Sequence, residues 1–282
     1  MNNKIIRHSV KGKYAYSMMH SDGYTFDSQI HPFYEILYLN AGSMLYNVEG
    51  TDYMLGEGDM VFTLPYEMHS FSFPEPCRYE RQFFHIYPAL IEPVKDMIPD
   101  MSKKEPGKMN CIPAAAVSHY GLDNVFRRLE ECSDPEMPET PSLMLAYAIE
   151  ILSRLHAAVT SGELNGADAP ANANVRRILG YIDKNYTSHI DLSDIAEYMY
   201  MDRSYVGRLF KLHTGVSLMI YVNMKRIVLA KNMIMDGTPA TEVYERCGFN
   251  DYSTFYRAFK RYVGVSPNEF RSGRSGQQAR YL

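Results

Sequence analysis

The spacing of hydrophobic and polar positions differs between the two halves of the chain. Between residues 10 and 90, short apolar runs such as residues 34–39 and 60–64 alternate with breaks that contain Gly and Pro. Runs of this length, separated by turn residues, predict short β-strands. Many short strands at this spacing are typical of a barrel or a sandwich. We therefore expect a β-domain in the first part of the chain.

From about residue 119 the apolar positions recur at helical spacing. Residues 119–131 and 142–159 are predicted to be helical, with the breaker residues 135–141 between them. The second of these helices is expected to carry one apolar stripe, which comprises Leu143, Leu145, Ala146, Ile149, Leu152 and Leu155. A stripe of this kind is typical of a helix that packs against a neighbouring surface.

Residues 161–174 contain almost no large apolar residue and are rich in Gly, Ala, Asn and Asp. This composition predicts a flexible linker. The chain is thus expected to comprise a barrel over residues 1–118, a helical segment over 119–160, the linker over 161–174 and a second domain over 175–282.

All the elements predicted after the linker are helices. They are expected at residues 175–186, 191–199, Arg203–Thr214, 217–235, 239–247 and Tyr252–Val263. Gly215 and Gly264 stand where a helix ends on a left-handed residue, and Pro239 suits the first turn of the helix that it opens.

A ten-residue sequence occurs twice in this domain. Arg208 to Ser217 (RLFKLHTGVS) returns at an offset of 49 as Arg257 to Ser266 (RAFKRYVGVS). A repeat of this period indicates two copies of one supersecondary unit. Together with the predicted helices, it gives a helix-turn-helix, a long connecting helix and a second helix-turn-helix. Two copies of a basic helix suit a regular polymer, and DNA is the expected partner.

In a helix-turn-helix, the first helix braces the second, which enters the major groove of DNA. Val206 and Phe255 are expected to face the core, and helical periodicity then turns a polar set outward in each unit. Arg, Ser and Lys are side chains that contact bases or phosphates. The predicted DNA contacts are Arg203, Ser204, Gly207, Arg208 and Lys211 in the first unit and Tyr252, Ser253, Tyr256, Arg257 and Lys260 in the second. The alternative is a helical bundle whose basic residues are only solvated.

Charge supports this division. The net charge is −4, but residues 171–282 hold 16 Lys and Arg against 10 Asp and Glu, which leaves 13 against 23 in residues 1–170. A basic half joined to an acidic half indicates nucleic-acid binding confined to one domain. The four Cys are scattered, which indicates a reducing compartment. Because no leader and no membrane-spanning stretch is predicted, a cytoplasmic protein is expected.

The second half closely resembles the AraC/XylS family of bacterial transcriptional regulators, from about residue 175 to residue 271. The resemblance rests on Ile195-Ala196, Arg208-Leu-Phe-Lys211, Tyr221, Arg226, Ala230, Gly248-Phe249, Phe255, Arg257-Ala-Phe-Lys260 and Gly264-Val-Ser-Pro267. It implies two helix-turn-helix units that enter successive major grooves on one face of the duplex, at a spacing fixed by the connecting helix.

One position departs from the family pattern. Tyr244 stands where the family usually has a small Ala in the bracing helix of the second unit. A Tyr at a close helix crossing must tilt outward or push the helices apart. The packing of the second unit, and with it the docking angle, is therefore expected to be affected.

In the first half, His31-Pro-Phe-Tyr-Glu35, Gly42, residues 58–65 and His69 resemble the two motifs of a cupin barrel, which many family members use to bind an effector. The predicted fold class is α+β multidomain: a cupin-like β-barrel with trailing helices, then an all-α domain of two helix-turn-helix units joined by a long helix. In catalytic cupins, two His and a Glu of the first motif and a His of the second hold a metal. Here Phe33 takes the place of the second His, and His85 could complete a set that suits Fe, Mn, Ni or Zn. We predict no metal and no other cofactor.

The barrel is instead expected to hold a small molecule. Aromatic faces can stack on a sugar ring, and His, Asn and Glu can bind its hydroxyls. A sugar is the effector class that the family resemblance implies, and no residue here identifies which sugar. The first predicted effector contacts are Asn40, Phe71, Phe83 and His85, followed by His31, Glu35, Tyr46 and His69. For each aromatic residue the alternative is a place in the core.

These features predict a ligand-responsive, sequence-specific DNA-binding transcriptional regulator that activates carbohydrate-utilisation genes and is not an enzyme. The expected partners are double-stranded promoter DNA, a small-molecule effector and RNA polymerase, with no membrane. The resemblance further implies that residues 119–160 pair two subunits into a homodimer. The alternative is a metal-dependent cupin enzyme fused to a DNA-binding domain, and the missing second His counts against it.

Overall fold

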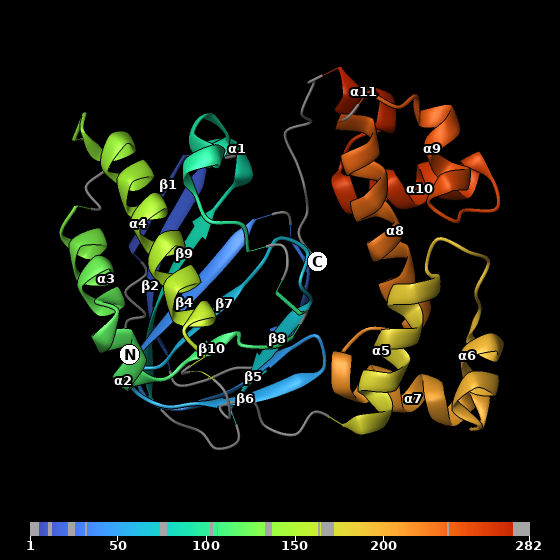
Figure 1. The fold of residues 1–282 in the computed structure, drawn as a ribbon, viewed down its shortest axis with the longest axis horizontal. Coiled ribbons are helices and arrows are strands. Elements are labelled where there is room, and N and C mark those ends of the chain that lie inside the picture. The colour runs from blue at the N-terminus through green and yellow to red at the C-terminus, as the bar shows by residue number, and fades with distance from the viewer. Residues whose placement is uncertain are drawn as a thin grey trace. The chain divides into compact units, whose positions relative to one another are not determined.

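The structure is a computed structural model with two compact units, Met1–Ala171 and Asn172–Leu282 (Figure 1). Each unit has its own hydrophobic core. It describes residues 6–10, 13–21, 26–31, 33–73, 78–101, 104–105, 107–132, 137–162, 164, 172–235 and 237–272. Most of the predicted linker, namely residue 163 and residues 165–171, lies outside the described residues.

The first unit is built on two antiparallel sheets. A six-stranded sheet has the order β1-β2-β9-β4-β7-β10, and a four-stranded sheet has the order β3-β8-β5-β6. The strands are Ile6–Val10 (β1), Tyr14–Ser21 (β2), Phe26–Gln29 (β3), Tyr34–Ala41 (β4), Met44–Val48 (β5), Thr51–Leu55 (β6), Met60–Thr63 (β7), His69–Ser72 (β8), Tyr79–Ile86 (β9) and Cys111–Ile112 (β10). The predicted β-domain is therefore confirmed.

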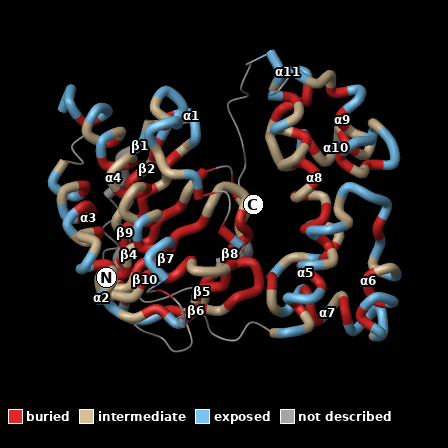
Figure 2. Tube along the Cα trace, viewed as in Figure 1, coloured by how far each residue is buried: buried red, intermediate tan, exposed pale blue. Residues whose placement is uncertain are grey.

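Alternation along the strands separates two cores, because successive side chains point to opposite faces of a sheet. Leu37 of β4 and Phe83 of β9 pack with Tyr46 of the smaller sheet. Their neighbours Ile36 and Phe84 belong to a second cluster, which the helices share. The first cluster fills the barrel interior, and Figure 2 shows buried residues along both sheets.

Helices cover the outer face of the larger sheet, where α3 and α4 lie side by side (Figure 1). The helical elements of this unit are α1 (Pro88–Ile91), the short 3-10 helix η1 (Glu92–Met97), α2 (Ala114–His119), α3 (Leu122–Glu131) and α4 (Thr140–Thr160). The helix predicted over 119–131 begins later, at Leu122. Gly121, in the left-handed conformation at φ 66°, separates α3 from a helix α2 that was not predicted.

The apolar stripe predicted on α4 is confirmed at Leu152 and Leu155, and Leu143 and Leu145 pack against the same core, but the prediction is wrong for Ala146 and Ile149. The side chains that enter the core are Met144, Tyr147, Ala148, Ile151, Leu152, Leu155, Ala158 and Val159, whereas Ala146 is exposed and Ile149 is only half-buried. α4 is apolar on most sides, so periodicity alone did not select the buried face. By length and composition alone α4 is also able to cross a membrane, contrary to expectation, but here one of its faces packs in the core.

The second unit is entirely helical among its described residues. Its helices are α5 (Ala173–Asn185), α6 (Leu192–Met199), α7 (Arg203–Thr214), α8 (Leu218–Met235), α9 (Ala240–Arg246), α10 (Tyr252–Val263) and α11 (Pro267–Arg271). The predicted bounds of α7 and α10 are confirmed, and only α11 was not predicted. α6 and α7 form the first helix-turn-helix, α9 and α10 form the second, and α8 connects them (Figure 1).

Candidate DNA interface and effector pocket

The two helix-turn-helix units are built around equivalent buried residues. Val206 in α7 and Phe255 in α10 stand 49 residues apart in the sequence, and both are fully buried. Phe210 and Phe259 repeat this relationship one turn later. The predicted core positions are confirmed, and the Phe of the repeated sequence is part of the scaffold.

Both recognition helices begin and end in the same way. Asp202 accepts a hydrogen bond from the backbone N–H of Tyr205 at 2.9 Å, and Asp251 accepts one from Thr254 at 2.7 Å. A carboxylate at this position satisfies a free helix N–H and suits the positive end of the helix dipole. The two Asp residues share the offset of 49, a signal that the sequence analysis missed. Both helices end on a left-handed Gly, as predicted.

The predicted contact residues of α7 lie mainly on its exposed face. Arg203, Ser204, Arg208 and Lys211 are exposed. Gly207 is half-buried, and a Cβ at this position would lie 3.5 Å from Leu192 Cδ2 of the bracing helix α6. Gly207 therefore borders the brace and is not fully on the outward face.

The corresponding face of α10 is more aromatic. Ser253, Arg257 and Lys260 are exposed, whereas Tyr252 and Tyr256 are half-buried. The ring of Tyr252 packs against the core, with its centroid 5.8 Å from that of Phe255. Tyr252 is thus partly a core residue, and the exposed polar edge of α10 is narrower than predicted.

Tyr244 of α9 is equivalent to Ala196 of α6. The backbone carbonyl of each accepts a hydrogen bond at 3.0 Å from the turn that follows, Tyr244 from Phe249 and Ala196 from Met201. The Tyr244 ring is half-buried and meets Tyr252 edge to face, with the ring centroids 6.0 Å apart. The larger side chain is therefore accommodated against the recognition helix. The second turn, from Gly248 to the start of α10, is also one residue longer than the first, from Tyr200 to the start of α7.

The turn after α5 holds the second helix-turn-helix against the rest of the helical domain. The buried Arg226 of α8 donates hydrogen bonds to the backbone carbonyls of Tyr186 at 2.6 Å and Ser188 at 2.8 Å. Gly248 packs against the same turn so closely that a Cβ would lie 2.8 Å from backbone atoms of Tyr186 and Thr187. This contact fixes where α9 ends and α10 begins.

In the first unit, the structure brings five of the predicted effector residues together between the two sheets. Tyr46 donates a hydrogen bond to Glu35 Oε1 at 2.9 Å, and His85 Nε2 lies 2.8 Å from Glu35 Oε2. His31 Nε2 and His69 Nε2 lie 3.3 Å and 3.5 Å from the same carboxylate. All except His85 are buried.

The charges in this cluster are strongly coupled. Burial lowers the pKa of His31 to about 4, so the ring is neutral near pH 7. Burial alone would raise the pKa of Glu35, but the three imidazoles, His69 foremost, hold it well below its usual range. Burial would lower the pKa of His69, yet Glu35 raises it overall. The site therefore presents a buried anion surrounded by imidazoles.

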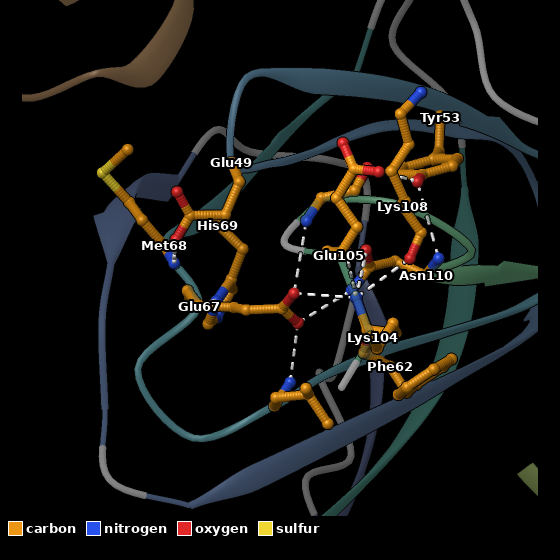
Figure 3. A network of polar contacts seen from close by, with 12 residues as sticks. Glu49, Tyr53, Phe62, Glu67, Met68, His69, Lys104, Glu105, Lys108 and Asn110 are labelled. Atoms are coloured by element: carbon orange, nitrogen blue, oxygen red, sulfur yellow. Dashed lines mark hydrogen bonds and ion pairs between the residues drawn. The ribbon is translucent and has the colours of Figure 1, made fainter. Parts of the chain in front are cut away.

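A separate polar network holds the strand that carries His69 (Figure 3). The buried Lys104 ammonium donates to Glu67 Oε1 at 2.8 Å and to Asn110 Oδ1 at 3.0 Å. The Glu67 carboxylate also accepts from Asn110 Nδ2 at 2.9 Å and from the backbone of Leu64 at 2.8 Å. Both partners of this buried ion pair make further hydrogen bonds, so the network holds the segment that leads into β8 and His69 in one conformation.

The other predicted aromatic residues border this cluster: the ring centroid of Phe71 lies 6.0 Å from that of Tyr46, and the ring centroid of Phe83 lies 5.7 Å from that of His85. Phe71 and Phe83 enclose Arg81, whose guanidinium carbon lies 4.3 Å and 4.4 Å from their ring centroids. Arg81 is buried in the barrel and was not predicted from the sequence. Asn40 lies at a bulge in β4, and among the described residues no contact joins it to the cluster.

Comparisons with known proteins match both units. The family model described as an AraC-like ligand binding domain matches residues 15–152, and a helix-turn-helix domain model matches residues 195–273. The HTH-type transcriptional activator RhaS of Escherichia fergusonii is 21% identical over 262 residues, which cover 88% of each chain.

Other relatives match only part of the chain. The transcriptional regulatory protein HptR of Staphylococcus aureus is 28% identical over 96 residues, which are 34% of this chain and 38% of HptR. The C-terminal domain of AraT, a response regulator from Geobacillus stearothermophilus, is 28% identical over 40% of this chain and 94% of that domain, with a TM-score of 0.36.

Proposed function

The chain belongs to the AraC family of DNA-binding transcriptional regulators with a ligand-binding domain, and we propose that it is an effector-responsive activator of carbohydrate-utilisation genes. The observation that carries the DNA-binding part is the pair of helices α7 and α10. They share equivalent buried positions, an Asp at the N-terminal cap, a Gly at the C-terminal end and exposed Arg and Lys residues, all at an offset of 49.

For DNA contact we propose the exposed edge of each recognition helix. Arg208 and Arg257 occupy equivalent positions and can read guanine through two hydrogen bonds. Lys211 and Lys260 follow one turn later and suit phosphate contacts. The remaining proposed contacts are Arg203, Ser204 and Gly207 in the first unit and Tyr252, Ser253 and Tyr256 in the second.

For the effector we propose the barrel interior. The cluster of His31, Glu35, Tyr46, His69 and His85 supplies acceptors and donors for hydroxyl groups, and Phe71 and Phe83 supply aromatic surface. This mixture of apolar walls with a few convergent polar groups is typical of small-molecule sites. We retain Asn40 as a proposed contact from its place in the motif, and a sugar as the effector class.

We further propose that the protein acts in the cytoplasm as a homodimer that recruits RNA polymerase. The similarity to RhaS, a transcriptional activator, supports activation. For the dimer, we propose the helical segment 119–160, in which the exposed Ala146 and Ala157 and the half-buried Ile149 leave an apolar surface on α4. Exchange of Ile149 for Lys should then shift the chain towards monomer in sedimentation velocity.

A gel-shift titration tests the central proposal. The full chain should bind its own upstream promoter more tightly than a random duplex of equal length at moderate salt, and equal affinity for both would overturn it. A thermal-shift screen against a panel of sugars tests the effector class, because a ligand that binds the folded chain raises its melting temperature by mass action.

A further inference from the structure

Three ligand-type side chains converge at one point inside the barrel. The nearest ligand atoms of His31, Glu35 and His69 all lie within 4.8 Å of one another, and all three residues are buried. His31 precedes β4, Glu35 lies within β4, and His69 begins β8 of the other sheet. The two sheets thus hold the three groups against each other from opposite sides.

The second nitrogen of each ring is fixed by the backbone. His31 Nδ1 lies 3.1 Å from the carbonyl oxygen of Phe33, and His69 Nδ1 lies 2.9 Å from that of Glu67. A carbonyl can only accept a hydrogen bond, so both Nδ1 atoms carry the proton and donate it. Because each Nδ1 is engaged with a carbonyl, Nε2 is the ring atom that remains to bind a cation, which would displace any proton that it carries.

The two Nε2 atoms nevertheless face each other at 3.2 Å. Two lone pairs at this distance repel each other unless a proton or a cation lies between them. The Glu35 carboxylate oxygens lie 3.3 Å and 3.5 Å from the same two atoms and add a third ligand group at that point. The arrangement is therefore complementary to a positive charge.

We propose that this cluster is a binding site for a divalent first-row transition-metal ion, with His31 Nε2, His69 Nε2 and the Glu35 carboxylate as ligands. Two imidazoles and one carboxylate favour such an ion over Mg²⁺ or Ca²⁺, which prefer oxygen ligands. The backbone carbonyls on Nδ1 are the outer partners that metal-binding His residues usually have. This site goes beyond the proposed effector response and is the opposite of the absence of metal expected from the sequence.

The surroundings support the ligands without completing the set. Tyr46 and His85 contact Glu35 and hold its carboxylate in place, while Phe33 stacks on His31 with the ring centroids 3.8 Å apart and the planes at 5°. Phe33, which takes the place of the second His of catalytic cupins, thus holds the His31 ring in position. A three-residue set leaves coordination positions open to water or to an oxygen of a bound small molecule.

The test uses the full chain without an affinity tag, stripped with EDTA and desalted. It is then loaded with ZnCl₂ or CoCl₂ and passed through gel filtration. Metal analysis should give about one ion per chain, the melting temperature should rise, and Co²⁺ should show visible d–d absorption. The variants are Glu35→Gln and His69→Gln, with His119→Gln as the matched control because His119 is exposed on α2 of the same unit.

The site predicts that Glu35→Gln and His69→Gln lose the ion and the shift in melting temperature, while His119→Gln keeps both. Tyr46→Phe preserves the packing and should weaken metal affinity roughly tenfold or more through its effect on Glu35. That variant keeps the test decisive if a ligand variant does not fold. Metal content in the wild type no higher than in Glu35→Gln, or no loss of affinity in Tyr46→Phe, would overturn the proposal. Promoter binding by the stripped chain is measured in parallel, so failure of the metal site is distinguishable from failure of the DNA-binding proposal.

Discussion

Replacement of Gly248 by Ala tests how the second helix-turn-helix is held in place. Gly248 has a φ of +85°, and an added Cβ would lie 2.8 Å from the Thr187 carbonyl carbon and oxygen and the Tyr186 oxygen. These are backbone atoms, and the Tyr186 oxygen is itself held by Arg226 at 2.6 Å. The neighbouring turn therefore cannot move aside without loss of this partly buried hydrogen bond.

Two costs add in this variant. A left-handed conformation costs a residue with a Cβ about 1–2 kcal/mol, and overpacking against a fixed neighbour costs about 1–3 kcal/mol. We therefore expect Gly248→Ala to lower the free energy of unfolding by about 2–5 kcal/mol, a large part of the 5–15 kcal/mol that is typical of domains.

Two other glycines separate these costs. Gly237 also has a positive φ, of +94°, but a Cβ there meets nothing within 4 Å, so Gly237→Ala should show only the conformational cost. Gly180 lies in α5 with no atom within 4 Å of its added Cβ, so Gly180→Ala should stabilise the chain by about 0.5–1 kcal/mol.

Urea unfolding of the full chain, followed by far-ultraviolet circular dichroism, measures all three variants. The expected order of stability is Gly180→Ala, wild type, Gly237→Ala and then Gly248→Ala. If Gly248→Ala is no less stable than Gly237→Ala, the close approach to the turn at Tyr186 does not constrain the second unit, and the reasoning is refuted. In a gel shift at a temperature where the variant is folded, Gly248→Ala should also weaken promoter binding, because the clash displaces α10.

Three further predictions concern the same unit. Arg226→Met should destabilise the chain by about 2–4 kcal/mol in urea, because it removes the donor of two charge-assisted hydrogen bonds to the Tyr186 and Ser188 carbonyls. An effect no larger than that of the exposed control Arg176→Met would contradict this role. Arg208→Ala should cost about 1–3 kcal/mol of binding free energy at one base step, whereas Lys211→Ala should weaken binding to all sequences alike and reduce the slope of affinity against salt by about one. Gel shifts with base-substituted promoters measure both, and a uniform loss of affinity in Arg208→Ala would disprove base reading by Arg208. Burial lowers the pKa of Lys231 from 10.5 to about 8. Between these pH values the unfolded chain binds more protons than the folded chain, so the free energy of unfolding should rise with pH. Lys231→Met should abolish this rise in urea midpoints measured at pH 7 and pH 9.5, and an unchanged rise would exclude Lys231 as its source.

Local sequence determined the helical unit almost completely. The bounds of α7 and α10 followed from the residues at their ends, because capping and left-handed termination depend on groups within a few residues of one another. The repeat at an offset of 49 identified equivalent core positions without any tertiary information. The sequence likewise indicated short strands in the first unit, since alternation and turn residues are local signals.

Tertiary structure decided which residues meet. His31 and Glu35 lie four residues apart in the sequence, but His69 and His85 belong to other strands, and only the pairing of β4 with β9 and the packing of the two sheets bring all three imidazoles to one carboxylate. The buried face of α4, the place of Arg81 between two Phe rings and the contact of Gly248 with the α5 turn were equally invisible in the sequence. Periodicity fixes the conformation of each element, whereas these contacts depend on the order and register in which distant elements pack, which no short stretch of sequence encodes.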